Sequence, residues 1–335
     1  MYGNGLLILC SLASVISLFG FVGNTLVFVG FQNTAPGTST SILFQALAVA
    51  DNFVLVTTIP VQWTKFISFF VLRPDHARIL HLLEAYIQTY IHPISNMSIL
   101  WSICITILLA VTRFIAVYFP LHASRLCSIP RIRICLGAIT LFSIAYNLPA
   151  YYVFTFMLSS SSNETYVTFY IRSFKMMKFM EYTRTALYAI IPLVLITTIT
   201  TLLIIKLRKL EKRRRHLTSR QQRNNNATRL LVAVLIVFLL CSLPFPLCIL
   251  IMKSTNTYFS LRLVQFLYCL TDVLYNVNSS VNFLIYTIFS KEYRKVITKS
   301  VKWFFCRHGN VNILHEQGRC AQILPEVVHQ MTTRV

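Results

Sequence analysis

The sequence predicts an all-α membrane protein, a seven-transmembrane helix bundle with a short amphipathic C-terminal helix. The first observation is composition: 56% of the 335 residues are hydrophobic, far more than a soluble protein of this size carries. The second is pattern, because the apolar residues form long runs, and about 20 such residues span a bilayer. These runs cover residues 6–31, 41–66, 86–118, 134–157, 184–206, 229–253 and 260–289.

The runs divide the chain simply. We expect residues 6–289 to form one transmembrane domain, preceded by a short extracellular segment at 1–5. Residues 290–305 place apolar side chains at helical spacing against a basic face, which predicts an amphipathic helix on the membrane surface. Cys306, at the end of that helix, is a candidate lipidation (palmitoylation) site. Residues 306–335 are expected to be a disordered cytoplasmic tail.

The charge distribution predicts the orientation. With the N-terminus outside, segments 113–133, 206–229 and 291–334 are cytoplasmic and hold 22 of the 31 Lys and Arg residues. This excess satisfies the positive-inside rule and predicts this orientation for a multi-pass membrane protein. The net charge of +21 then reflects topology and attraction to anionic membrane lipid, not nucleic acid. Asn163 begins an Asn-Glu-Thr glycosylation acceptor on the outer side.

The segments that interrupt the apolar runs predict the connections between the helices. A loop of about 20 residues is expected after the second run, and a second outer loop at about 159–183. Pro120 should end the third run after Tyr118. The third inner loop is expected to extend spans five and six as helices around a polar tip. No cysteine of the nine lies in an expected outer loop, so no extracellular disulfide framework is predicted.

One acid, Asp51, lies deep in the second span. A carboxylate inside hydrocarbon costs several kcal/mol or more unless it has partners, so it marks a functional position. The last span carries polar side chains that could supply them, in the run Asn278 to Tyr286. Together these two spans predict a polar core within the helical bundle.

The spans also carry one short motif each. They are Gly23-Asn24, Leu47 to Asp51, Thr112-Arg113 to Leu121, Pro192, Phe238 to Phe245, and Asn282 with Tyr286. In this order and at these depths they resemble the rhodopsin-like G-protein-coupled receptors over residues 20–305. Within that class, Leu121–Cys127 and Asn278–Tyr286 are similar to the invertebrate FMRFamide receptors.

Several positions depart from the class pattern. Thr112 stands where an acid usually precedes the arginine, and Phe283 stands where a proline usually follows Asn282. Ser242 replaces a tryptophan two residues before Pro244. Gln88 occupies the place of the third-span cysteine, and the second outer loop holds no cysteine to pair with it. The anchoring of that loop is therefore left open.

The resemblance implies roles for the polar core and the inner end. Asp51, Ser102, Asn278, Ser279 and Asn282 match a pocket that holds an allosteric sodium ion, and no other cofactor is implied. A polar network without an ion, with water or a protonated Asp51, is the alternative. Arg113 and Thr112 would meet the G protein once span six swings about Pro244, with Phe238, Asn282 and Tyr286 in the moving core. Arrestin is a further implied partner.

The resemblance also implies a ligand site at the outer end. A peptide ending in Arg and Phe-amide would pair its arginine with Asp272. Ser95 at the amine receptors' acid position and Asn276 at the opsins' lysine position argue against those two ligand classes. A structural pairing of Asp272 with Lys253 or Arg262, ordinary helix packing of the aromatics, and anchoring at Glu84, Glu164 or Glu181 are the alternatives. The expected aromatic and polar wall comprises Tyr268, Tyr275, Phe245, Trp63, Tyr90, His92 and Ser95.

An enzyme is not predicted, because the histidines show no metal-ligand spacing within a span and no nucleophile or phosphate-loop motif appears. The function that the resemblance implies is a plasma-membrane receptor for an FMRFamide-like neuropeptide that activates a heterotrimeric G protein. A chemosensory receptor for small molecules is the alternative. A channel or transporter is more distant, since it would favour paired ionisable residues along several spans.

Overall fold

A computed structural model describes residues 2–34, 37–70, 74–161, 164–212, 219–244, 261–289 and Arg294. The expected amphipathic helix and tail lie outside these residues except for Arg294, as do Asn163, Phe245 and Cys306. The backbone of Tyr268 is described, but not its side chain.

The described chain is almost entirely helical. Its elements are α1 (Tyr2–Thr34), α2 (Ser39–Phe70), α3 (Pro74–Tyr86), a π-helical turn (Ile87–Ile91), α4 (His92–Tyr118), α5 (Pro120–Leu126), α6 (Ile129–Asn147), α7 (Pro149–Val153), β1 (Phe154–Ser161), β2 (Glu164–Ile171), α8 (Phe174–Thr185), a second π-helical turn (Ala186–Ile190), α9 (Ile191–Lys212), α10 (Ser219–Ser242) and α12 (Leu261–Phe289).

Six of the seven predicted spans are helical over almost all of their described residues, the fourth is helical as far as Val153, and the predicted helical-bundle membrane fold is confirmed. Five helical segments of the described chain are long and apolar enough to cross a membrane, and Leu231–Ser242 is a shorter apolar helix. The segment α12 falls outside this group because it carries the polar run that begins at Asn276. A strip of polar residues in a spanning helix is tolerated where it faces the bundle interior.

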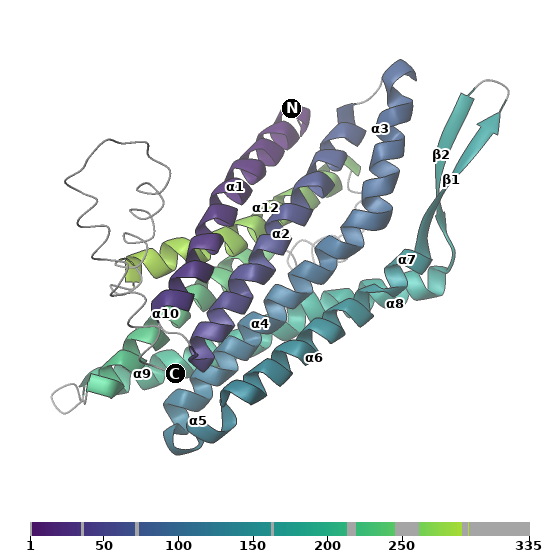
Figure 1. Ribbon diagram of the computed structural model, residues 1–335. Helices are drawn as coiled ribbons and strands as arrows, with labels where there is room; N and C mark the ends of the chain where they lie inside the picture. The colour runs from purple at the N-terminus through teal and green to yellow at the C-terminus, as the bar shows by residue number, and fades with distance from the viewer. Residues whose placement is uncertain are drawn as a thin grey trace, which may run out of the picture.

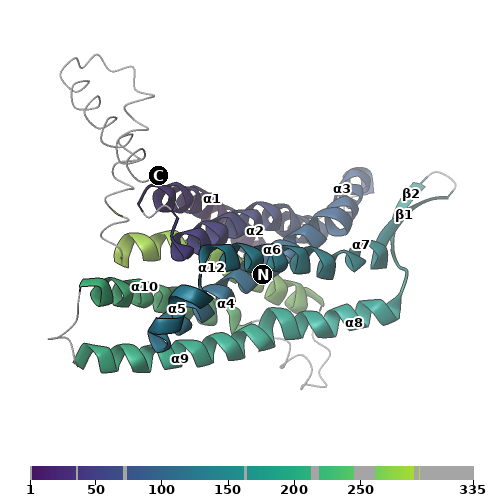
Figure 2. The ribbon, with the colours of Figure 1, turned by 60° about the horizontal axis from the view of Figure 1, so that its bottom comes forward.

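The helix α4 lies at the centre of the bundle, in contact with α2, α6, α9 and α10, while α1 packs on α2 and α12. Figure 1 shows α3 and the β1–β2 hairpin at the end of the molecule where the N-terminus lies, with α5 at the opposite end. Figure 2 shows α8 and α9 as one long rod with α10 beside α9. A large apolar core, including Leu47, Ile105 and Phe238, fills the space between these helices.

The outer connections differ from the prediction. The loop expected after the second span is mostly helix, because α2 runs to Phe70 and α3 starts at Pro74 and continues into α4. The second outer loop is an antiparallel hairpin, with Phe154 paired to Ile171 at its base. Span four therefore ends at Val153 and not 157, and the fifth span starts at Phe174 and not 184. At the inner end, Tyr118 closes α4 as predicted.

Both π-helical turns lie close to a proline. One ends at Ile91, two residues before Pro93, and the other at Ile190, two residues before Pro192. Proline lacks the amide hydrogen that continues the α-helical ladder, so the preceding turn widens. The third and fifth spans are therefore continuous but locally unwound near their outer ends.

The contact between α1 and α12 is unusually close. A Cβ atom on Gly23 would lie 2.7 Å from the Cβ of Phe283, and one on Gly20 would collide with Ser280. The Ser280 hydroxyl donates a hydrogen bond of 3.0 Å to the Ile16 carbonyl across this contact. Gly23 thus provides the room that Phe283 of the last span needs, and Gly20 provides the room for Ser280.

Candidate functional site

The polar core predicted around Asp51 is present in the structure. Asp51 is fully buried on α2, and its two carboxylate oxygens accept hydrogen bonds from helices on either side. The Ser102 hydroxyl of α4 donates to Oδ1 at 2.7 Å, and the Asn282 amide of α12 donates to Oδ2 at 2.7 Å. Ser279 is a third side chain directed at this carboxylate. Three helices therefore meet at one acid, as the cost of burying a carboxylate in hydrocarbon requires.

Asn24 extends this cluster to the first helix. Its side-chain amide donates a hydrogen bond of 2.9 Å to the Ser279 carbonyl. Its Oδ1 atom is buried and accepts no hydrogen bond from the described residues. One carboxylate, two hydroxyls and this amide oxygen are hard ligands of the kind that a small cation prefers. No hydrogen bond in the described structure joins Asn278 to Asp51.

A second polar contact lies nearer the outer end and was not predicted. Asn276 of α12 accepts a hydrogen bond of 2.8 Å from Thr58 of α2 and donates one of 2.9 Å to Ser17 of α1. Asn276 is fully buried, so these bonds satisfy its amide inside the bundle. The signal for this contact in the sequence is the polarity of Asn276 itself.

At the inner end, Arg113 is buried on α4 and its guanidinium donates a hydrogen bond to the hydroxyl of Thr40, in the first turn of α2. Its Nε atom has no hydrogen-bond partner in the described structure. The neighbouring Thr112 donates to the Leu109 carbonyl of its own helix at 2.9 Å. Thr112 therefore does not restrain Arg113, and a hydroxyl from another helix does.

The second inner loop is tied to the same corner. Ser39 donates a hydrogen bond of 2.5 Å to the Cys127 carbonyl, and the Cys127 thiol lies 4.0 Å from the Thr112 carbonyl. Burial raises the pKa of this thiol, and the nearby Arg113 charge partly offsets that rise. The loop, α2 and α4 thus form one connected unit around the arginine.

The other residues expected in activation lie in the core. Tyr286 is buried between two aromatic rings of α1 and α2, with ring centroids 5.7 Å from Phe31 and 5.0 Å from Phe44. Phe238 is buried in the central core. Pro244 lies just past Ser242, where α10 ends, and the chain beyond it is outside the described residues.

The predicted outer residues do not all face one site. Trp63 donates a hydrogen bond of 3.0 Å to Ser14 and packs at the α1–α12 contact, in agreement with the alternative of ordinary helix packing. Ser95 is buried, whereas His92 is half-buried and lies 3.5 Å from Asn96.

Tyr90, Tyr275 and Asp272 have different surroundings. Tyr90 is largely exposed, and Tyr275 packs against the central core. Asp272 is half-buried on α12. The side chains of its alternative partners, Lys253 and Arg262, lie outside the described residues.

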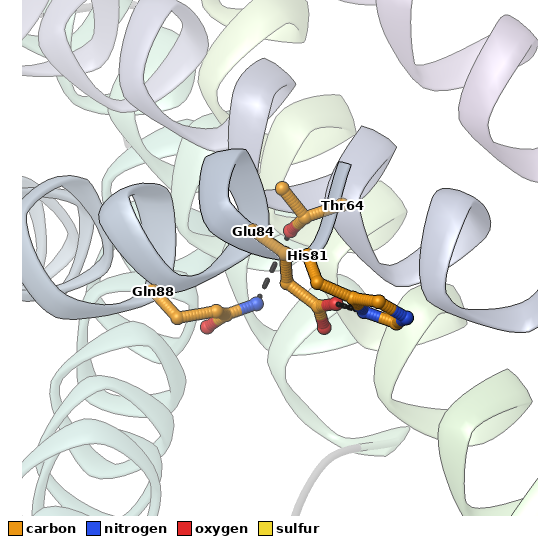
Figure 3. Close-up of polar contacts among 4 residues, drawn as sticks. All are labelled: Thr64, His81, Glu84 and Gln88. Carbon is orange, nitrogen blue, oxygen red and sulfur yellow. Dashed lines mark hydrogen bonds and ion pairs between the residues drawn. The ribbon is translucent and has the colours of Figure 1, made fainter. Parts of the chain in front are cut away.

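The third span is anchored without the usual cysteine. Gln88, in its place, donates a hydrogen bond of 3.2 Å to Thr64 of α2, and Figure 3 shows this contact beside the His81–Glu84 pair at 3.6 Å. The hairpin is held by a ring contact of 5.1 Å between Tyr86 and Phe156.

At the base of the hairpin, the Tyr151 hydroxyl donates a hydrogen bond of 3.2 Å to the Tyr90 carbonyl. Together with the Tyr86–Phe156 contact it links the segment around the hairpin to the outer end of the third span. Aromatic and hydrogen-bond contacts thus hold the outer loop that the sequence left unanchored.

Comparison with known proteins decides the class of this bundle. Residues 11–304 match the model of the family described as serpentine type 7TM GPCR chemoreceptor Srw. The chain belongs to this family of G-protein-coupled receptors. It is therefore a multi-pass membrane receptor, and the family is one of receptors, not enzymes. The resemblance predicted from the span motifs is confirmed.

The individual relatives share a low sequence identity with this chain. The chain is 22% identical to the FMRFamide receptor of Drosophila melanogaster over 292 residues, which are 85% of this chain and 52% of that protein. It is 28% identical to the FMRFamide peptide receptor frpr-18 of Caenorhabditis elegans over 86% of this chain and 68% of that protein. It is 25% identical to the Sex peptide receptor-related protein 2 of C. elegans over 69% and 56%. The chain thus spans little more than half the length of two of these three relatives.

Proposed function

We propose that the protein is a plasma-membrane receptor for an FMRFamide-like neuropeptide, with its N-terminus outside, and that it activates a heterotrimeric G protein. The observation that carries this proposal is similarity to two receptors named for FMRFamide peptides over 85% and 86% of the chain. Arrestin and anionic lipid at the basic inner face are further partners in this proposal. The inner basic segments support the orientation.

The outer half of α12 supplies an acid that could contact the peptide. Asp272 is half-buried on α12, four residues from Asn276, on a helix that contacts α2 and α10. A partly desolvated carboxylate binds a peptide guanidinium more strongly than an exposed one, because water screens the pair less. The β1–β2 hairpin stands at the same end of the molecule (Figure 1). Asp272 is therefore the acid we assign to the arginine of the peptide.

The conformational change that follows agonist binding then passes through the polar core to Arg113. Agonist contact on α12 changes the position of a helix that bonds Asp51 through Asn282. Tyr286 lies one turn below Asn282 and packs on α1 and α2, so the same helix reaches the inner core. Release of Arg113 from Thr40 would free the guanidinium for a G protein. A sodium ion held by Asp51 and Ser102 would favour the resting arrangement.

The test is G-protein activation in cells that express the chain, screened against peptides ending in Arg-Phe-amide and the same peptides with a free carboxylate. We expect a response to the amides that falls at least tenfold in potency in Asp272→Asn. Glu84→Gln is the matched control, because Glu84 pairs with His81 at 3.6 Å on α3 and should leave potency unchanged. A response lost in Glu84→Gln and kept in Asp272→Asn would move the peptide anchor to α3.

A chemosensory receptor for small molecules is the second candidate, and the description of the matched family as a chemoreceptor favours it. The same cells discriminate the two functions. Surface expression without a response to any amidated peptide, followed by a response to a small-molecule panel, would reject the neuropeptide proposal in favour of this one.

A further inference from the structure

Two cysteine thiols meet in the contact between α1 and α12. The sulfur atoms of Cys10 and Cys269 lie 3.9 Å apart, although 259 positions separate them in the sequence. Both side chains are fully buried, and Leu9, Trp63 and Phe266 pack around them.

The geometry allows a bond with little movement. A disulfide needs sulfurs about 2 Å apart, so the thiols must approach by roughly 2 Å, which side-chain rotation can supply where the backbones are close. The two helices do approach closely on both sides of the pair. A Cβ atom on Gly5 would lie 3.3 Å from the Phe266 ring, and Gly20 leaves no space for a Cβ beside Ser280.

The depth of the pair also suits oxidation. Cys10 follows the start of α1 by eight residues and Cys269 follows the start of α12 by eight, so each lies about 12 Å along its helix. Both helix starts lie at the outer end if the N-terminus is outside, as the proposed function requires. During synthesis that side faces the secretory lumen, which is oxidising and forms disulfides. The outer half of the bundle is thus the half in which a disulfide persists.

We propose that Cys10 and Cys269 form a disulfide that joins α1 to α12 in the mature protein. As α12 docks, one thiolate attacks a glutathione or protein disulfide of the lumen, forming a mixed disulfide and releasing one thiol. The second thiolate attacks the mixed disulfide and releases the other thiol. Two cysteines are oxidised, one lumenal disulfide is reduced, and the two protons leave on the released thiols.

The bond would provide a covalent link at the outer end of the bundle, which the third span does not provide. Gln88 ties that span to Thr64 through one hydrogen bond, so it forms no covalent link to the hairpin. A Cys10–Cys269 bond instead fixes the outer ends of the first and last helices. The inner half of α12, which carries Asn282 and Tyr286, stays free to move relative to the linked end.

The test uses the full chain with a protease recognition sequence inserted between Lys212 and Ser219, so that cleavage separates Cys10 from Cys269. Membranes are denatured with N-ethylmaleimide to block thiols, cleaved and run on a non-reducing gel. We expect most of the protein to migrate at full mass without reductant and to separate into two fragments with dithiothreitol. Mass spectrometry should recover the joined peptide.

Variants identify the linked pair. Cys10→Ser and Cys269→Ser should each release the fragments without reductant, whereas the exposed Cys135→Ser should keep them joined. Fragments that separate in the unsubstituted chain, or that stay joined in Cys10→Ser, would overturn the proposal.

Glycosidase treatment of the unsubstituted chain and of Asn163→Gln reports the orientation independently. Separated fragments on a glycosylated chain reject the disulfide alone, and separated fragments on a chain without glycan reject the outward N-terminus as well. The gel needs no agonist, so failure of the neuropeptide assignment leaves its result intact.

Discussion

Arg113 donates a hydrogen bond to the hydroxyl of Thr40, and the arginine at the inner end of α4 is thereby tied to the first turn of α2. The hydroxyl of Thr112, the residue beside it, donates to the carbonyl of Leu109 on its own helix. The restraint that an acid would provide in this class is replaced by a neutral hydroxyl from a neighbouring helix. A single neutral partner holds a guanidinium less strongly than a carboxylate does.

Removing this restraint should raise basal signalling. Thr40→Val keeps the shape of the side chain and deletes the acceptor, so the resting state loses a bond to a charged group, which contributes about 1.5 kcal/mol or more. This corresponds to roughly a tenfold shift in the balance between states. We expect a several-fold rise in agonist-free GTPγS binding at equal surface expression. Thr57→Val is the control, because the Thr57 hydroxyl bonds its own helix at an exposed position; an equal rise in both variants would contradict the assignment.

An acid at position 112 should have the opposite effect. Thr112→Glu would place a carboxylate next to the buried Arg113 and stabilise the resting state by a charge-assisted hydrogen bond. We expect basal signalling to fall below that of the unsubstituted chain, and Thr112→Gln, which has the same shape without the charge, to leave it near the starting value. Basal GTPγS binding that is unchanged in Thr112→Glu would show that Arg113 is already fully restrained.

The close contact of α1 and α12 should be sensitive to one methyl group. Gly23→Ala places a Cβ atom 2.7 Å from Phe283, and overpacking of this kind costs about 1–3 kcal/mol. We expect a lower thermal denaturation midpoint in detergent. Gly137→Ala on α6 meets nothing within 4 Å and gains helix propensity of roughly 1 kcal/mol, so its midpoint should be equal or higher. Equal midpoints for the two variants would show that α12 moves away at little cost.

The buried amide of Gln62 should also be visible in stability. Gln62 is fully buried on α2, and neither its side-chain oxygen nor its nitrogen has a hydrogen-bond partner in the described structure. An unsatisfied buried amide costs about 1–3 kcal/mol, so Gln62→Leu should raise the denaturation midpoint. Gln45→Leu is the control, since Gln45 donates a hydrogen bond of 3.0 Å to Ser41 and its loss should not stabilise. A lower midpoint in Gln62→Leu would indicate that a bound water or ligand satisfies the amide.

The fold and the site were predictable from the sequence where physical chemistry leaves few alternatives. A buried acid in a spanning helix needs partners, and the polar run of the last span was the nearest supply, so this run was expected to bond Asp51. In the described structure Asn282 of the run makes that bond, whereas Asn278 does not. Proline marked the end of α4 for a similar reason. Both features follow from the chemistry of single residues, which can be seen directly in the sequence.

The features that were missed depend on tertiary contact. In the sequence, Thr40 looks like an ordinary residue of the first turn of a helix. Its bond to Arg113 joins residues that are 73 positions apart, so no local pattern predicts it. The segment from Pro74 to Tyr86 looked like a loop because its polar residues resemble one, yet it continues the third span as helix. The hairpin base at Phe154 was missed because the apolar residues of β1 extend the fourth hydrophobic run without a break.

The polar core itself can be tested through sodium. If Asp51, Ser102 and Ser279 hold the ion, sodium at ten times its Kd stabilises the folded receptor by about 1.4 kcal/mol, because a ligand that binds only the folded state adds RT ln(1 + [L]/Kd). We expect a higher denaturation midpoint in NaCl than in choline chloride at equal ionic strength, and no such difference in Asp51→Asn. Asp272→Asn removes an acid from a different helix, α12, so this variant should retain the sodium effect. An unsubstituted receptor that is indifferent to sodium, together with a stabilised Asp51→Asn, would favour a polar network without an ion, because burial of the carboxylate is then an uncompensated cost.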